Sequence, residues 1–368
     1  MNTIPFNQLA PLYDLLADEI QPAVERVMAS GWFILGPEVA AFEQEFAAYH
    51  GVKHAVGVAN GTDAIELALR VASVGPGDEV ITVSHTAVAT VCAIEQAGAV
   101  PVLVDIDPQS FTIDPAAIEA AITPRTRAII PVHLYGHPAA IAPISEIAAR
   151  HNLLLIEDCA QAHGARSNGQ LVGTFGHLAA FSFYPTKNLG AYGDGGAILT
   201  NDDRFAERLR RLRSYGQTQR YIHAERGVNS RLDELQAAIL RVKLRHLDEH
   251  NQQRRQIARI YDTHLREVMT PTEAPDVHHV YHLYVVRHGA RDALMQALAQ
   301  QGVGTLIHYP VPVHLQDAYD DLGYRPGSLP VTEQTAREIL SLPMYIGLKP
   351  HDVERAARAV EACSRVLS

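Results

Sequence analysis

Two short apolar runs in the middle of the chain lead directly into side chains that can do chemistry. Residues 153–156 are followed by Asp158, and the segment that begins at Phe181 reaches Lys187 just before a glycine-rich stretch. Buried strands of an α/β sheet show this pattern where they end at a binding site. The first strand therefore delivers a carboxylate and the second an amine. The same two segments also carry Gln161, His163, Ser182 and Tyr184.

A lysine in this setting has two interpretations. An arbitrary lysine after a strand usually lies in a surface turn. A lysine held by glycines and apolar walls can instead lose its proton and become a Schiff-base nucleophile. Asp158, at the end of another buried strand, favours the second interpretation for Lys187. An amine for the aldehyde and a carboxylate for the pyridine nitrogen are two of the three groups that pyridoxal 5'-phosphate (PLP) needs, and the third is a phosphate site.

A phosphate site is predicted upstream. Residues 56–59 read as a small apolar strand, and Gly61, Thr62 and Asp63 follow it just before a segment with helical spacing. A glycine turn that opens a helix presents backbone N–H groups and the positive end of the helix dipole to an anion. The alternative is an ordinary capped helix. Together with the aspartate and lysine segments, the phosphate site is the better interpretation.

Four segments carry a resemblance to a known family. They are Ala-Asn-Gly-Thr at 59–62, Glu-Asp-Cys-Ala-Gln at 157–161, Ser-Phe-Tyr-Pro-Thr-Lys-Asn at 182–188 and Asn-Ser-Arg-Leu at 229–232. With them the chain resembles the DegT/DnrJ/EryC1/StrS family of PLP-dependent sugar aminotransferases, and the resemblance extends from residue 31 to residue 310. It is most similar to members that aminate C3 of a nucleotide-linked 3-keto-6-deoxysugar.

The resemblance implies a role for each motif residue. Lys187 bonds to the cofactor and later moves a proton, and Asp158 keeps the pyridine nitrogen protonated. Gln161 donates to the ring oxygen, and His85 stacks on the face of the ring, although His85 is also compatible with a solvated loop. The expected phosphate ligands are Gly61, Thr62, Ser182 and Asn229, the last reaching across a homodimer interface into a shared active site.

The reaction that the resemblance implies is transamination from an amino acid, L-glutamate, to a nucleotide-linked keto-sugar, in a ping-pong scheme. The expected acceptor is C3 of a dTDP-3-keto-6-deoxyhexose, with C4 of a dTDP- or UDP-4-keto sugar as the alternative. His163 and Tyr184 are candidate sugar contacts, against the alternative that both are core residues. Arg231 is a candidate for the donor carboxylate. His308 and Tyr309 are expected to face the cofactor cleft.

Two functions of other classes compete with this interpretation. A PLP-dependent sugar dehydratase of the same family carries His where Lys187 stands, or binds an iron–sulfur cluster, and the chain has neither feature. A DNA-binding regulator would need a basic recognition surface. The formal net charge of −10 argues against one and against nucleic-acid partners generally.

Alternating strand and helix patterns between residues 55 and 156 predict a three-layer αβα domain with a mostly parallel sheet. By resemblance this is the fold type I of PLP-dependent aminotransferases. A change in composition after residue 271 predicts a smaller C-terminal α/β domain. We therefore expect a large PLP-binding domain over residues 1–250 and a small domain over residues 251–368.

Composition limits the remaining possibilities. The chain has 368 residues, 47% of them hydrophobic, which is enough for a sizeable core. No apolar run reaches the ~20 residues of a membrane span. Cys92, Cys159 and Cys363 lack metal or disulfide spacing, so we expect no metal site and a reducing compartment, the cytoplasm.

Overall fold

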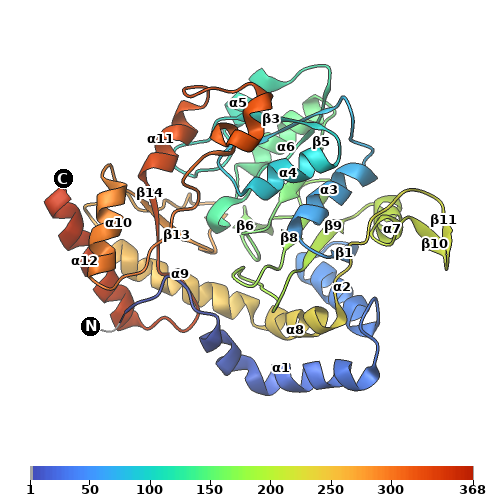
Figure 1. Cartoon of the computed structure of the whole chain (residues 1–368), viewed down its shortest axis with the longest axis horizontal. Helices are drawn as coiled ribbons and strands as arrows, with labels where there is room; N and C mark the ends of the chain where they lie inside the picture. The colour runs from blue at the N-terminus through green and yellow to red at the C-terminus, as the bar shows by residue number, and fades with distance from the viewer. Residues whose placement is uncertain (1–2, 368) are drawn as a thin grey trace.

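The structure is a computed structural model that describes residues 3–367. A β-sheet lies at its centre (Figure 1). It has seven strands in the order β1-β9-β8-β5-β4-β2-β3. Only β9 runs antiparallel to its neighbours, so the other six strands point the same way. The bounds are β1 His54–Val58, β2 Glu79–Val83, β3 Val100–Val104, β4 Thr126–Ile129, β5 Leu154–Asp158, β8 Leu178–Ser182 and β9 Gly196–Thr200.

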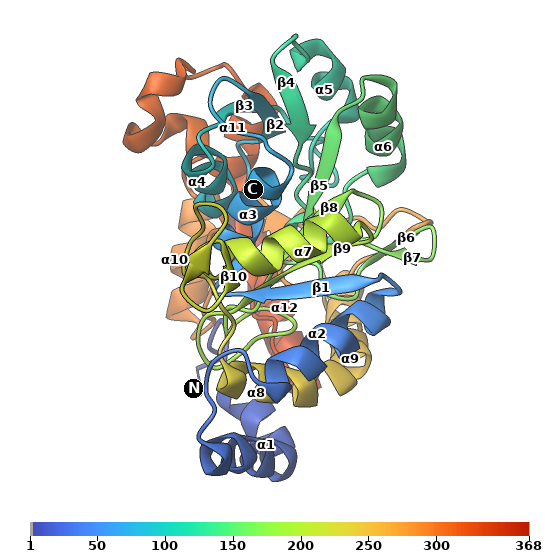
Figure 2. The same cartoon turned by 90° about the vertical axis from the view of Figure 1, so that its right-hand side faces the viewer.

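Helices cover both faces of the sheet, which makes the predicted three layers. One face packs against α3, α4 and α7, and Figure 2 shows α7 lying along β9 and β1. The other face packs against α2 and α8 at one end and against α5 and α6 at the other. The bounds are α2 Pro37–His50, α3 Gly61–Val71, α4 Val88–Gln96, α5 Pro115–Ala121, α6 Ile141–Arg150, α7 Asp203–Leu212 and α8 Glu234–Arg245.

Strand β8 shows why its sequence is apolar throughout. Leu178 and Ala180 pack into the core beneath α3, whereas Ala179 and Phe181 pack into the core beneath α2 and α8. Successive side chains of a strand point to opposite faces, so a strand covered on both faces must be apolar at every position. The strand reaches its first polar residue, Ser182, at the edge where the parallel strands end.

A smaller α/β unit follows in the chain. Its strands β13 and β14 pair antiparallel and share a core with α9, α10 and α12. Ile4 belongs to this core and pairs with Val303, so the start of the chain packs with its C-terminal part. The predicted boundary at residue 250 falls in the first turn of α9 and stays a prediction. The bounds are α9 Leu247–His264, β13 Tyr284–Arg287, α10 Arg291–Gln300, α11 Pro330–Glu338, β14 Ile339–Leu342 and α12 Pro350–Leu367.

Minor elements complete the fold. Helix α1, Ala10–Ser30, packs against α8 at the lower edge of Figure 1.

No helix within residues 3–367 combines the length and the apolar character needed to cross a bilayer. The remaining elements are β6 Arg166–Ser167, β7 Gln170–Leu171, β10 Gln217–Gln219, β11 Ile222–His223, β12 Val277–His278 and the 3-10 turns η1 Leu134–Gly136, η2 Val313–Leu315 and η3 Asp317–Leu322.

A single carboxylate fastens the start of α2 to the start of α8. Glu234 accepts hydrogen bonds from the backbone N–H groups of Gly36, Glu38 and Val39 at 2.8–2.9 Å. It satisfies three of the orphan donors at the N-terminus of α2 and complements the helix dipole. The preceding loop, residues 31–35, is thereby tied to α8, although its side chains Trp32, Phe33 and Ile34 are exposed.

Candidate active site

The N-terminus of α3 opens onto a cavity at the edge where the parallel strands end. Asn60 caps the helix, because its Oδ1 accepts from the N–H of Asp63 at 2.8 Å. Gly61 and Thr62 form the first turn and line the cavity. A Cβ at Gly61 would lie 2.7 Å from the Cβ of Ser182, so only glycine lets α3 approach β8 this closely. The three residues form the cradle that suits a phosphate.

Asp158 ends β5 and faces the same cavity. Its Oδ1 accepts from the N–H of Ala160 at 3.1 Å, and its Oδ2 accepts from the hydroxyl of Thr90 at 2.8 Å. Burial raises the pKa of Asp158, while these hydrogen bonds and the charge of Lys187 pull it back down. The carboxylate is therefore held at both oxygens and keeps free acceptor capacity for a ligand.

Lys187 lies in the turn that follows β8, where its N–H donates to the carbonyl of Tyr184 at 2.9 Å. The side chain is half-buried and lines the cavity. Burial lowers its pKa to about 8, and the nearby Asp158 carboxylate opposes that shift. A lysine with this pKa loses its proton more readily than an ordinary lysine, which a Schiff-base nucleophile and a general base both need.

The cavity has a volume of about 230 Å³. A phosphate cradle, a carboxylate and a lysine converge on it, which is the donor set that PLP requires. The residues present therefore fit the cofactor. The lining residues within the described chain are Asn60, Gly61, Thr62, Ile65, Thr86, Ala87, Ala89, Thr90, Val132, Asp158, Ala160, Gln161, Ser182, Tyr184, Lys187 and Asp194.

Gln161 joins the large sheet to a loop of the C-terminal unit. Its Oε1 accepts from the N–H of Tyr135 at 2.8 Å, and its Nε2 donates to the hydroxyl of Tyr309 at 3.2 Å. The Tyr135 hydroxyl donates to the carbonyl of His308. Burial lowers the pKa of His308 to about 4 and raises that of Tyr309 to about 12, so both are neutral near neutral pH. The structure thus brings Tyr309 beside Gln161. Neither His308 nor Tyr309 is among the cavity-lining residues within the described part of the chain, so their predicted place at the cofactor cleft stays a prediction.

Two predicted histidines lie elsewhere. His85 is buried, and its Nε2 lies 2.9 Å from the Tyr135 hydroxyl. The Tyr135 hydroxyl donates its proton to the carbonyl of His308, so His85 is the donor to Tyr135. His163 is fully buried against Phe181 and Phe183, and burial lowers its pKa to about 3. Neither is among the lining residues in the part of the chain that the structure describes. The geometry therefore supports the core alternative for His163. On the segment after β2, Ala87 lines the cavity in place of His85.

Tyr184, the other candidate for a sugar contact, lines the cavity and is 52% exposed, so it is placed to meet an incoming substrate. Asn229 and Arg231 lie on the segment before α8. Asn229 is exposed and Arg231 half-buried, and within residues 3–367 neither contributes to the wall of this chain's own cavity. Their predicted roles therefore depend on a second subunit.

Sequence reasoning missed Thr86 and Thr90. Both line the cavity, and Thr90 bonds directly to Asp158. They stand four residues apart across the start of α4, a spacing that places side chains on one helical face. That spacing, just after a buried strand that ends at the same edge, is the signal by which they could have been found.

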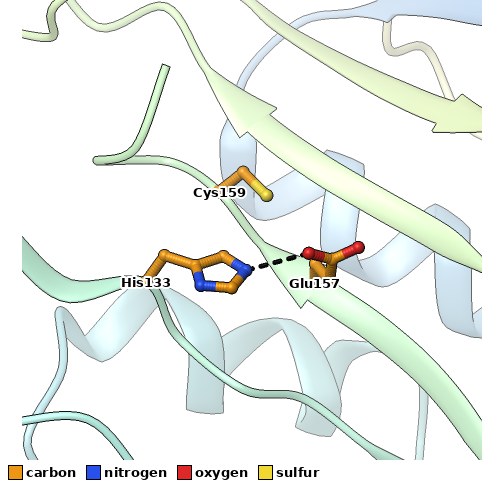
Figure 3. Close-up of side chains that lie close together, drawn as sticks. All are labelled: His133, Glu157 and Cys159. Carbon is orange, nitrogen blue, oxygen red and sulfur yellow. Dashed lines mark hydrogen bonds and ion pairs between the residues drawn. The ribbon is translucent and has the colours of Figure 1, made fainter. Parts of the chain in front are cut away.

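Three buried side chains near the site resemble a metal centre in composition only. Figure 3 shows His133, Glu157 and Cys159, whose ligand atoms lie within 4.8 Å of one another. The Nδ1 of His133 accepts from the N–H of Ala139, so its Nε2 carries the proton and donates to Glu157 at 3.0 Å. Glu157 also accepts three backbone N–H groups from the loop 173–176. These bonds engage the possible ligand atoms of His133 and Glu157, and Glu157 anchors the loop that leads into β8.

Residues 14–361 match the DegT/DnrJ/EryC1/StrS aminotransferase family. The chain belongs to this family. The aminotransferase is therefore an enzyme, its cofactor is PLP, and its mostly parallel α/β architecture is that of its solved relatives. The family, fold class and cofactor predicted from the sequence are confirmed.

Relatives of this aminotransferase match it over almost the whole chain. The erythromycin biosynthesis sensory transduction protein EryC1 of Saccharopolyspora erythraea is 53% identical, over 98% of each chain. The dTDP-3-amino-3,4,6-trideoxy-alpha-D-glucose transaminase of Streptomyces venezuelae is 50% identical, over 98% of this chain and 95% of its own. The crystal structure of S. venezuelae DesV in complex with a ketimine intermediate is 49% identical, with a TM-score of 0.97 and 99% of both chains covered.

Proposed function

We propose that this aminotransferase moves an amino group from L-glutamate to C3 of a dTDP-linked 3-keto-6-deoxyhexose. The observation that carries the proposal is the convergence of Lys187, Asp158 and the N-terminus of α3 on one cavity. The name of the S. venezuelae transaminase, a C3 enzyme on a dTDP-sugar, supports the acceptor. Transfer to C4 is the alternative outcome of the test below.

Each residue of the cavity has a distinct task in this proposal. PLP, when bound, supplies an electron sink that makes the carbon next to the amino group acidic. Lys187 holds the cofactor and then carries the proton between that carbon and the cofactor, for which a pKa of about 8 is well suited. Asp158 holds a proton on the ring nitrogen. The phosphate is bound by Gly61, Thr62 and Ser182. Gln161 orients the cofactor ring by donating to the ring oxygen.

Absorbance spectroscopy tests the donor and the acceptor together. We expect the purified protein with PLP to show the visible band of lysine-bound cofactor, L-glutamate to bleach it, and a dTDP-linked 3-keto-6-deoxy sugar to restore it. Restoration by the 4-keto sugar instead would move the reaction to C4. A band that glutamate leaves unchanged would exclude glutamate as the donor.

We further propose that two subunits share each active site. The support is the exposed position of Asn229, the absence of Asn229 and Arg231 from the wall of this chain's own cavity within residues 3–367, and an exposed apolar loop at Trp32 and Phe33 that is tied to Glu234. Asn229 then completes the phosphate site of the partner, and Arg231 binds the carboxylate of the amino donor.

Subunit mixing tests the shared site. Lys187→Ala and Asn229→Ala homodimers should each be impaired, whereas mixing them should restore activity, because a hybrid dimer contains one site with both residues intact. The absence of recovery, with hybrids demonstrated by mass spectrometry, would contradict a shared site.

We also propose that the enzyme works in the cytoplasm. Its cysteines, Cys92, Cys159 and Cys363, are all free, which suits a reducing compartment.

A further inference from the structure

A chain of hydroxyl groups leads to Asp158. The Thr90 hydroxyl donates to Oδ2 of Asp158 at 2.8 Å, and the hydroxyls of Thr86 and Thr90 lie 3.0 Å apart. A hydroxyl has one proton. Because Thr90 gives its proton to the carboxylate, Thr86 must be the donor to Thr90. The bonds therefore run in one direction, from Thr86 through Thr90 to Asp158.

The two hydroxyl groups and the carboxylate are buried. Thr86, Thr90 and Asp158 are 3%, 1% and 4% exposed, so water does not compete effectively for their hydrogen bonds. Thr90 lies in the first turn of α4, and Asp158 is the last residue of β5. Hydrogen bonds to an ionised group are strong in such surroundings, and a donor that polarises another donor strengthens the second bond.

We propose that Thr90 is a positioning residue that keeps Asp158 ionised and turned toward the ring nitrogen of PLP. The inference rests on the proposed role of Asp158. Burial favours the protonated carboxyl, which could not hold a proton on the ring nitrogen. Thr90 favours the carboxylate by donating to one oxygen, and the Ala160 N–H fixes the other. Thr90 keeps its own proton throughout.

One nearby charge acts on the same carboxylate. Lys187, across the cavity, favours the ionised form of Asp158. Thr86 acts one bond further away and should have the same effect on a smaller scale.

The experiment is ¹⁵N NMR of the holoenzyme reconstituted with PLP labelled at the ring nitrogen, because that chemical shift reports directly where the proton lies. At neutral pH we expect Thr90→Val to move the shift toward that of unprotonated pyridine. Thr90→Ser keeps the hydroxyl and should retain the wild-type shift. PLP affinity should fall about tenfold in Thr90→Val, the usual effect of losing a hydrogen bond to a charged group.

Two variants make the outcome decisive. Thr82→Val is the matched control, since Thr82 is equally buried but donates to the carbonyl of Ile130. It should leave the nitrogen shift unchanged, which separates positioning from general loss of packing. Asp158→Asn should abolish nitrogen protonation. If Asp158→Asn leaves the shift unchanged, the proposed role of Asp158 is wrong. If Asp158→Asn changes it and Thr90→Val does not, only the role of Thr90 is wrong.

Discussion

The enzyme contains two lysines with similarly lowered pKa values and different surroundings. Burial brings the pKa of Lys187 and that of Lys243 to about 8. Lys187 is half-buried, opens onto the cavity and faces Asp158. Lys243, on α8, is 4% exposed, donates from Nζ to the carbonyl of Gly190 at 2.7 Å and lies 4.0 Å from the centre of the Tyr192 ring.

The comparison shows that a lowered pKa alone does not identify a nucleophile. The amine of Lys243 donates to the Gly190 carbonyl and lies over the Tyr192 ring, so no ligand can reach it. Lys187 has the same basicity with a cavity in front of it. The two are also linked, because the Gly190 carbonyl that Lys243 holds belongs to the same loop after β8 as Lys187. In the proposed function Lys187 does the chemistry, whereas Lys243 holds the backbone carbonyl of Gly190.

Replacing Lys187 should have the largest effect. Lys187→Ala removes the proposed attachment point of the cofactor and the proposed proton carrier, and we expect turnover to fall by about 10⁴-fold or more. The fold should persist, because the side chain opens onto the cavity. Coupled assays of the purified variant and its circular dichroism spectrum measure the two effects. Appreciable transaminase activity in Lys187→Ala would end the assignment.

Gly190 connects the two lysines, and a methyl group there should disturb both. Its Cβ would lie 2.4 Å from the carbonyl oxygen of Pro185, so the loop must shift, at about 1–3 kcal/mol. We expect Gly190→Ala to lower both thermal stability and PLP affinity. Gly193→Ala is the control, since its Cβ would meet only the Gln236 side chain, at 3.2 Å. Equal behaviour of the two variants would show that the loop is not tightly packed.

In protein stripped of its cofactor, both lysines should make the free energy of unfolding depend on pH in the alkaline range. Each has a folded pKa of about 8 and an unfolded value of about 10.5. Between these values the unfolded chain binds more protons, so the free energy of unfolding rises with pH, and below about pH 8 the contribution is constant. Lys187→Met and Lys243→Met should each remove part of this rise in urea titrations. If the free energy of unfolding rises with pH as steeply in both variants as in the wild type, the lowered pKa values of the two lysines are wrong.

Lys243→Met should have the smallest effect on the reaction. The substitution leaves the Gly190 carbonyl without its donor but also removes a buried charge, and these effects oppose each other. We expect activity to fall less than tenfold, and the visible band of lysine-bound cofactor to keep its position and its pH dependence. A loss of activity as large as that of Lys187→Ala would mean that Lys243 takes part in the chemistry.

The groups that converge on the cavity could be predicted from the sequence because they follow local patterns. Asp158 and Lys187 come where apolar strands end, and Gly61 comes where a strand turns into a helix. Strands that run in parallel bring such residues to one edge, so their meeting follows from fold class alone.

The directions of side chains in loops could not be predicted. His85 lies beyond the end of β2, where no strand period fixes the direction of its side chain. Its ring forms a hydrogen bond with Tyr135 and does not line the cavity. His163 lies in a turn that packs onto Phe181 and Phe183 of a distant segment. The bond from Thr90 to Asp158 joins positions 68 residues apart, and nothing local encodes it.

The three hydrogen bonds that Glu234 accepts from the start of α2 should affect how fast these amides exchange with solvent. A loop with three exposed apolar side chains would ordinarily exchange its amide protons quickly, together with the helix turn beside it. The amides of Gly36, Glu38 and Val39 are instead held by a carboxylate almost 200 residues away in the chain. Their exchange with deuterium should therefore follow the opening of α8 rather than the motion of their own loop.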